Sequence, residues 1–258
     1  MEFGICLHSV VPVRAEPSDR SEMVSQLLFG ELLEIKDNSN GWFQVSIEHD
    51  GYMGWIDEKQ CTSLDQKSFV HVSALDLNLV TDPVALLEHS SGRKMRIVAG
   101  SSLPGLQNNQ LVLAGNVFRY KGSSIKWMEL STRPILVHYA MSYLGTPFMW
   151  GGRTPFGIDC SGFTQMVYRL AGIPLHRDAH QQVLQGQSRT FADEAQPGDL
   201  AFFDDEEGRI IHTGIVLAES KIIHASGSVR IDTLDHQGIF NHDSGSYTHM
   251  LRVIRYHL

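Results

Sequence analysis

The first 60 residues alternate apolar and polar positions in short runs, which is typical of β-strands with one buried face. The runs cover residues 5–13, 31–35, 42–47 and 52–56. Asn40-Gly41 precedes the third run, and Asp50-Gly51 joins the third run to the fourth as a hairpin would. Four or five short strands in this length predict a small β-barrel over residues 1–64.

Residues 65–130 have a similar but less regular character. Glycines and polar turn residues recur between strand-like stretches such as 96–99 and 110–113. We therefore expect a second small β domain here. Its similarity to the first is too faint to define a repeat.

The pattern changes from strands to helices near residue 131. A serine or threonine at 131–132 with Pro134 just inside predicts a helix start, and Gly145 closes the helix after about Leu144. A second, amphipathic helix begins near Cys160 and ends at Gly172 and Pro174. Its apolar face is formed by Phe163, Met166, Val167 and Leu170.

A third short helix is predicted near residues 178–185, and the rest of the chain is a strand meander. The expected strands are 198–204, 210–218, 221–226 and 248–257. Helices followed by consecutive strands give an α+β order over residues 131–258.

The charge and composition of the chain exclude some classes of binding partner. The formal net charge of -8 argues against nucleic acid and anionic membranes. No run approaches the ~18 apolar residues of a membrane span, and the N-terminus lacks the features of a signal peptide, so we expect a cytoplasmic protein. Three cysteines without a Cys-x-x-Cys pair predict no cofactor and no metal ligands; Cys6 and Cys61 fit core thiols better than a disulfide.

Cys160 is the first candidate for chemistry. A thiol on the first turn of a helix lies at the positive end of the helix dipole, which favours the thiolate. The alternative is a buried cysteine that only packs, because free cysteine is among the most buried residue types.

His212 and His224 favour the catalytic interpretation. Each lies inside an apolar strand, where a polar side chain is costly unless it is satisfied. The two strands are joined by a short turn, so antiparallel pairing would bring the imidazoles together. A cysteine nucleophile needs a base and a group that orients the base, and this pair can supply both.

Five motifs in order resemble the NlpC/P60 cysteine peptidases. They are Tyr-Leu-Gly-Thr-Pro-Phe-Met-Trp-Gly-Gly at residues 143–152, Asp-Cys-Ser-Gly-Phe at 159–163, Pro-Gly-Asp-Leu-Ala-Phe-Phe at 197–203, His-Thr-Gly-Ile at 212–215 and His-Ala-Ser at 224–226. The resemblance implies a papain-like catalytic domain over residues 131–258. It also implies that Cys160 is the nucleophile, His212 the base and His224 the orienting residue.

The two β units resemble bacterial SH3 domains, the first more clearly. This arrangement is similar to the γ-D-glutamyl-L-diamino acid endopeptidases that recycle murein peptides with a free N-terminal L-alanine. The resemblance implies that Asp178, 18 residues after Cys160, binds the ammonium group. Asp178 with Gln181 also fits a helix capping box. Glu16 and Tyr52 match the positions from which the first domain reaches the cleft, although a surface charge and barrel packing are the simpler roles.

The same resemblance implies further substrate-lining residues at Asp159, Ser161, Trp150 and Ala179. The chain departs from the family at Phe148, where a tyrosine hydroxyl often faces the developing oxyanion. Loss of one oxyanion donor lowers turnover by ~10²–10³ in a well-studied protease.

The expected reaction is therefore amide hydrolysis by acyl transfer on a murein-derived peptide, by a protein that we expect to be monomeric. Two alternatives stay open. One is a secreted hydrolase that cuts intact stem peptides in the cell wall. The other is a wall-binding SH3-like protein on an inactive peptidase scaffold.

Overall fold

The computed structural model describes residues 2–128, 132–190 and 192–258, and it confirms the α+β class. The chain forms two compact units, Met1–Glu129 and Leu130–Leu258. The domain boundary expected between residues 130 and 131 lies outside the described residues. Among the described residues, no helix is long and apolar enough to cross a membrane.

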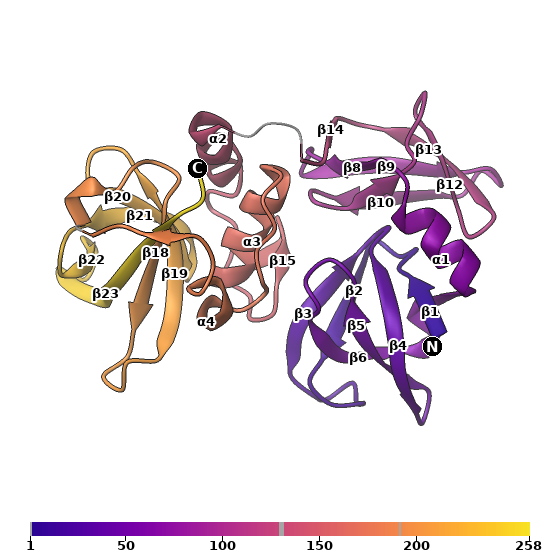
Figure 1. The fold of residues 1–258 in the computed structure, drawn as a ribbon, viewed down its shortest axis with the longest axis horizontal. Helices are drawn as coiled ribbons and strands as arrows, with labels where there is room; N and C mark the ends of the chain where they lie inside the picture. Colours follow the sequence, from indigo (N-terminus) through magenta and orange to yellow (C-terminus); the bar gives the residue numbers. More distant parts are fainter. Residues whose placement is uncertain (1, 129–131, 191) are drawn as a thin grey trace. The chain divides into compact units, whose positions relative to one another are not determined.

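The first part of the N-terminal unit is a curved antiparallel sheet (Figure 1). The predicted hairpin is confirmed: β5 pairs with β6, with Trp42 opposite Asp57. The run 5–13, expected as one strand, is broken between Ile5 and Val10 and contributes to two strands. The strand order is β3-β2-β6-β5-β4-β1-β7, with β1 (Glu2–Ile5), β2 (Val10–Arg14), β3 (Met23–Leu28), β4 (Leu32–Ser39), β5 (Trp42–Ile47), β6 (Met53–Asp57) and β7 (Thr62–Leu64).

The second part of this unit begins with a helix that the pattern did not predict, α1 (Gln66–Ser73). The Asp65 side chain caps it by accepting the Ser68 N–H, and Val72 is its buried residue. Two sheets follow. One has the order β10-β9-β13-β12, from β9 (Val84–His89), β10 (Lys94–Val98), β12 (Gln110–Leu113) and β13 (Asn116–Lys121); the other has the order β11-β8-β14, from β8 (Leu77–Val80), β11 (Ser102–Pro104) and β14 (Ser124–Lys126).

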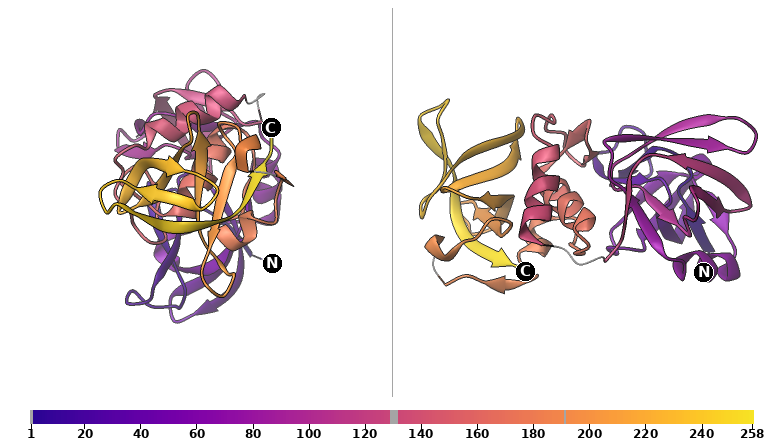
Figure 2. Two further views of the ribbon diagram at one scale, coloured as in Figure 1. Left: turned by 90° about the vertical axis from the view of Figure 1, so that its left-hand side faces the viewer. Right: turned by 90° about the horizontal axis from the view of Figure 1, so that it is seen from above.

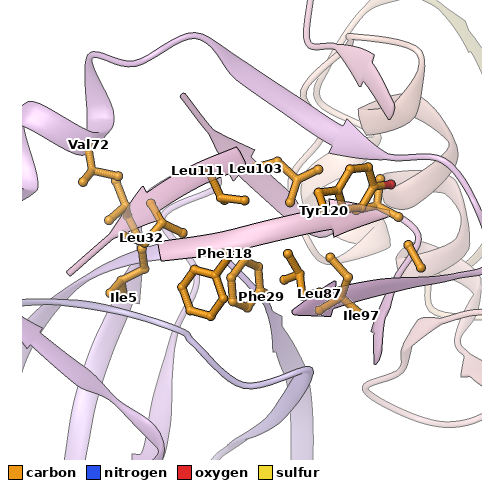
Figure 3. Packing of buried hydrophobic residues seen from close by; sticks show 13 residues of the cluster. Ile5, Phe29, Leu32, Val72, Leu87, Ile97, Leu103, Leu111, Phe118 and Tyr120 are labelled. Atoms are coloured by element: carbon orange, nitrogen blue, oxygen red, sulfur yellow. The ribbon is translucent and has the colours of Figure 1, made fainter. Parts of the chain in front are cut away.

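The two parts share one hydrophobic core. Figure 3 shows Phe29 of the first part against Phe118 of the second. The centroids of the two rings are 5.5 Å apart. Phe3 and Phe69 also stack, at 4.2 Å. The labelled members of this cluster are Ile5, Phe29, Leu32, Val72, Leu87, Ile97, Leu103, Leu111, Phe118 and Tyr120. Residues 2–64 and 65–128 are therefore packed as one body.

The C-terminal unit begins with helices that lie together along one side of its sheet (Figures 1 and 2). The first, α2 (Arg133–Ser142), starts after Thr132 as predicted; Ser131 lies outside the described residues. The cysteine helix is α3 (Cys160–Leu170), and the third is the single turn α4 (Ala179–Gln182). The amphipathic pattern of α3 is confirmed, but its polar face is not exposed: every residue of α3 is buried, because the helix packs on α2, α4 and the sheet.

The sheet of this unit closes on itself through an added pairing of β22 with β23. The four predicted strands are present, and β21 and β22 were missed. The order is β17-β23-β18-β19-β20-β21-β22, with β17 (Gln187–Ser188), β18 (Leu200–Asp204), β19 (Ile210–Leu217), β20 (Lys221–Ser226), β21 (Ser228–Leu234), β22 (Gly238–Asn241) and β23 (Ser246–Tyr256); a short hairpin joins β15 (Arg153–Thr154) to β16 (Gly157–Ile158).

Candidate active site

Cys160 is the first residue of α3, and Asp159 caps the helix in front of it. The carboxylate of Asp159 accepts the Gly162 N–H at 2.7 Å, which satisfies one of the free donors of the first turn. Both residues are buried. The nucleophile candidate is thus placed by a capped helix start, as the sequence indicated.

The Trp-Gly-Gly loop packs directly on this helix start. The Gly151 N–H donates to the second oxygen of Asp159 at 2.8 Å, and Gly151 has a φ of 73°, which favours glycine. Gly152 and Gly162 approach so closely that a Cβ on Gly162 would lie 2.3 Å from the Gly152 oxygen. The glycines of two motifs are therefore required for the same contact.

A buried arginine holds the segment after α3 against the same carboxylate. Arg177 donates to both oxygens of Asp159, at 3.0 and 2.5 Å, and to the Ser161 hydroxyl at 3.0 Å. The Arg177 and Asp159 side chains are only 1% and 7% exposed. A bidentate pair of this kind fixes orientation as well as charge, so residue 178 is held close to the start of α3.

Asp178 forms the capping box with Gln181 that the sequence suggested. Ala179 is buried at the first position of α4. The buried Gln182 side chain ties α4 to α3, since its amide donates to the Ser161 carbonyl at 2.9 Å and its oxygen accepts from Thr164 at 2.7 Å. The half-buried Asp178 carboxylate is therefore held on a rigid turn.

The two predicted histidines stand on one face of the sheet. His224 lies opposite Gly214, which is two positions along β19 from His212, and alternate residues of a strand share a face. His212 Nε2 is 2.8 Å from His224 Nδ1. A Cβ at position 214 would lie 2.8 Å from the His224 Cβ, so glycine is needed there.

A buried carboxylate continues this chain. His224 Nε2 is 3.0 Å from Asp232 Oδ2, and Arg230 donates to both oxygens of Asp232, at 2.7 and 2.9 Å. Burial works to raise the pKa of Asp232, but the hydrogen bonds from Arg230 and His224 lower it overall. An ionised carboxylate only accepts, so the His224 proton lies on Nε2.

This assignment determines the proton on His212. Because His224 Nε2 carries the proton, His224 Nδ1 is an acceptor and His212 Nε2 donates to it. The lone pair of neutral His212 is then on Nδ1. The order Asp232–His224–His212 thus sets the tautomer that a general base requires.

The two halves of the site meet where α3 contacts β19. The backbone N–H groups of Thr213 and Ser161 hydrogen bond to the Cys160 sulfur and lower its pKa, as does the charge of Arg177. Burial, with a smaller contribution from Asp159, outweighs them and raises the pKa of Cys160 to about 12. Burial likewise lowers the pKa of His212 well below its usual value. Burial thus favours the neutral thiol and the neutral imidazole, whereas the helix dipole alone predicted a thiolate.

A third imidazole lies beside this pair. The His249 ring, on β23, stacks on His212 with centroids 4.1 Å apart and planes at 25°. Burial lowers the pKa of His249 to about 4. Burial therefore favours the neutral form of all three imidazoles, and the Asp232 carboxylate lies beside His224.

Comparison with known proteins follows the same division of the chain. Residues 145–247, which contain Cys160, His212 and His224, match the model of the NlpC/P60 family. The C-terminal unit carries an NlpC/P60 domain. Residues 13–60 match the bacterial dipeptidyl-peptidase SH3 domain, so the N-terminal unit carries SH3-like sheets.

Relatives match either the whole peptidase or its catalytic part. A γ-D-glutamyl-L-lysine dipeptidyl-peptidase of Bacillus cereus is 27% identical over 89% of this chain and 76% of its own length. A probable endopeptidase p60 of Listeria seeligeri is 38% identical, over 40% of this chain and 20% of its own. The crystal structure of a Bacillus cereus NlpC/P60 family protein has the same fold: TM-score 0.85, 22% identity, covering 98% of this chain and 99% of that one.

The chain is therefore an NlpC/P60-type cysteine peptidase. The family identification argues against the interpretation as an inactive scaffold. The roles of individual residues in the peptidase stay predictions, supported by the geometry above.

The remaining predicted residues fall into two groups. In the C-terminal unit, Trp150 is 61% exposed and Phe148 is 38% exposed, whereas Asp159 and Ser161 use their polar atoms within the Arg177 network. This favours a positioning role for Asp159 and Ser161. In the N-terminal unit, the Glu16 side chain is exposed and Tyr52 packs partly buried against the barrel core, so their approach to Cys160 stays a prediction.

Three residues of the site were not predicted from the sequence: Asp232, Arg230 and His249. Asp232 is 3% exposed, whereas the neighbouring Ile231 on the same strand is 36% exposed. The alternation of apolar and polar residues would predict the opposite, with Ile231 buried and Asp232 exposed. His249 is one of 13 histidines and belongs to no motif. The role of Arg177 was not predicted either, although Arg177 directly precedes Asp178 in the chain.

Proposed function

We propose that this peptidase hydrolyses the γ-D-Glu–diamino acid bond of murein peptides that carry a free N-terminal L-alanine, and releases L-Ala-γ-D-Glu. The observation that carries the proposal is the relationship to a γ-D-glutamyl-L-lysine dipeptidyl-peptidase along 89% of the chain, which includes both units. A relative that shared only the catalytic part would support peptide cleavage without this specificity.

In the proposed mechanism, substrate binding brings the γ-carbonyl to Cys160. The thiol proton moves to Nδ1 of His212 as the sulfur attacks, and the His212 imidazolium keeps its Nε2–H bond to His224. His212 then protonates the departing amine of the diamino acid. Water hydrolyses the thioester and regenerates the thiol.

The same proposal assigns the oxyanion to the backbone N–H of Cys160, because Phe148 has no hydroxyl. Asp178 pairs with the ammonium group of L-alanine, and Glu16 and Tyr52 are assigned to substrate binding. Trp150, which is 61% exposed, is assigned to substrate binding. The setting that fits this specificity is recycling of released murein peptides in the cytoplasm by a monomeric enzyme.

The test uses L-Ala-γ-D-Glu-diaminopimelate and the full chain. Cys160→Ala is expected to lower kcat/KM by ~10⁴-fold or more, since it removes the nucleophile. Cys61→Ala is the matched control, because Cys61 is a free, half-buried thiol of the N-terminal unit. Cleavage by Cys160→Ala at the rate of the control would disprove the assignment.

N-acetylation of the tripeptide tests the specificity. Loss of the ammonium should block turnover if Asp178 binds it, and unchanged rates would remove that part of the proposal. The 38% identity of the catalytic part to a probable endopeptidase p60 favours a second candidate, cleavage of intact stem peptides. Release of peptides from whole sacculi would support that candidate instead.

A further inference from the structure

Three imidazoles converge from three strands of the closed sheet. His212 on β19, His224 on β20 and His249 on β23 each place one ring nitrogen within 4.8 Å of the other two. The proposed peptidase mechanism uses only His212 and His224. The position of His249 is therefore unexplained by the reaction.

The cluster has the donor set of a transition-metal site. Neutral imidazole is a preferred ligand of Zn²⁺, with Zn–N distances of about 2.0–2.1 Å, which separates the nitrogens of a tetrahedral site by about 3.3 Å. His212 Nε2 and His224 Nδ1 are 2.8 Å apart and need to move only slightly. His249 Nδ1 lies 2.9 Å from the Thr248 hydroxyl, which leaves Nε2 for a metal after a rotation of the ring.

The surroundings of His224 also match a metal ligand. Histidines that bind metals usually donate their second N–H to a carboxylate, which orients the ring, and His224 Nε2 makes this contact with Asp232. The nearby positive charge of Arg230 is offset by Asp232 and by Asp243, 2.7 Å from its guanidinium. A cation at the cluster thus meets no uncompensated positive charge from Arg230.

We propose that His212, His224 and His249 bind Zn²⁺ and that the bound ion inhibits the peptidase. A neutral imidazole that binds metal through Nε2 carries its proton on Nδ1. His212 would then be unable to accept the Cys160 proton, while His224 keeps the tautomer that Asp232 sets. The binding claim stands on the cluster alone; the inhibition claim rests on the proposed function.

Metal binding is measured on the full chain without reference to activity. Zn²⁺ affinity is determined by competition with a chromogenic chelator, and the visible absorption of bound Co²⁺ reports the coordination. His249→Phe, which keeps a ring against His212, should weaken Zn²⁺ binding at least ~10-fold. The matched control is His242→Gln, since His242 is exposed on the same unit. Equal affinity of wild type and His249→Phe would overturn the proposal, as would the lack of any competition by wild type.

His249→Gln is a second variant should the phenylalanine disturb folding, which thermal unfolding would reveal. Inhibition is then measured on the tripeptide, each variant relative to its own metal-free rate. Wild type should be inhibited by Zn²⁺, not by Mg²⁺, and recover with EDTA, while His249→Phe should need at least ~10-fold more Zn²⁺. If wild type does not cleave the tripeptide, the peptidase proposal fails and the binding experiment still decides the metal site.

Discussion

The cysteine half and the histidine half of the candidate site are each supported by an arginine–aspartate pair, but the pairs differ in burial. Arg177 and Asp159 are almost completely buried at the start of α3, with 1% and 7% of the side chains exposed. Arg230 is 29% exposed, while its partner Asp232 is 2% exposed. The first pair lies inside the fold, and the second lies at its edge.

The two pairs therefore contribute differently. Asp159 caps a helix and holds the Trp-Gly-Gly loop, so the Arg177 pair stabilises the structure that carries the nucleophile. Asp232 contacts His224, so the Arg230 pair controls the proton position on the base. Removing the first should be seen mainly in stability, and removing the second mainly in turnover.

The largest expected effect follows from Asp232→Asn. The asparagine amide can donate to His224 Nε2, which favours the His224 tautomer with its proton on Nδ1. His224 Nδ1 then donates to His212 Nε2, so the proton of neutral His212 moves to Nδ1 and His212 cannot act as the base there. We expect kcat to fall by ~10²–10⁴-fold with a smaller change in KM, by analogy with the aspartate of a serine protease triad. Steady-state kinetics on the tripeptide provide the measurement.

Asp243→Asn is the control for that experiment. Asp243 binds the same Arg230 guanidinium, but its side chain is 79% exposed. Among the described residues, no hydrogen bond joins Asp243 to His224. Its turnover should stay close to wild type. Wild-type turnover in Asp232→Asn as well would show that the carboxylate does not set the tautomer.

Next in size is Arg177→Met. It leaves the buried Asp159 carboxylate without its charged partner, and breaking a buried ion pair in this way costs about 3–5 kcal/mol of unfolding free energy. Denaturant unfolding and hydrogen exchange of α3 amides measure the loss. Arg230→Met should cost about 1 kcal/mol or less, because that guanidinium is partly solvated. Equal losses in the two variants would contradict the contrast.

The contrast between the halves also explains what the sequence could predict. The helix start at Cys160, the capping box at Asp178 and the hairpin after Asp50 depend on residues close together in the chain, and all three features were predicted. The α1 helix was missed because only Val72 is buried on it. Local sequence patterns are therefore sufficient to predict the position of a residue that a single helix or turn holds in place.

The histidine half depends on strand register instead. Asp232 reaches His224 only because β21 pairs with β20, with Ile222 opposite Asp232. His249 reaches His212 because β23 lies beside β18, which itself pairs with β19. These pairings join distant segments and include bulges in the β18 ladders, so no spacing in the sequence indicates them.

A smaller effect tests whether the helix dipole or burial determines the ionisation of the Cys160 thiol. A pKa of about 12 for Cys160 predicts that labelling by iodoacetamide keeps rising with pH beyond pH 9 and shows no plateau under mildly acidic conditions. Cys160→Ala gives the background from Cys6 and Cys61, whose thiol pKa values are also raised by burial. A plateau below pH 7 would show that the resting cysteine is a thiolate after all.

The smallest expected effect concerns acid stability. Burial depresses the pKa values of His212, His224 and His249 below the unfolded value near 6.5, so their contribution to stability is present above pH 6.5 and is lost as the pH falls. The C-terminal unit should therefore melt a few degrees lower at pH 5 than at pH 7. His249→Phe should reduce this difference, whereas His242→Gln should leave it unchanged. An equal difference in melting temperature between pH 5 and pH 7 in wild type and His249→Phe would show that His249 is not desolvated by its contact with His212.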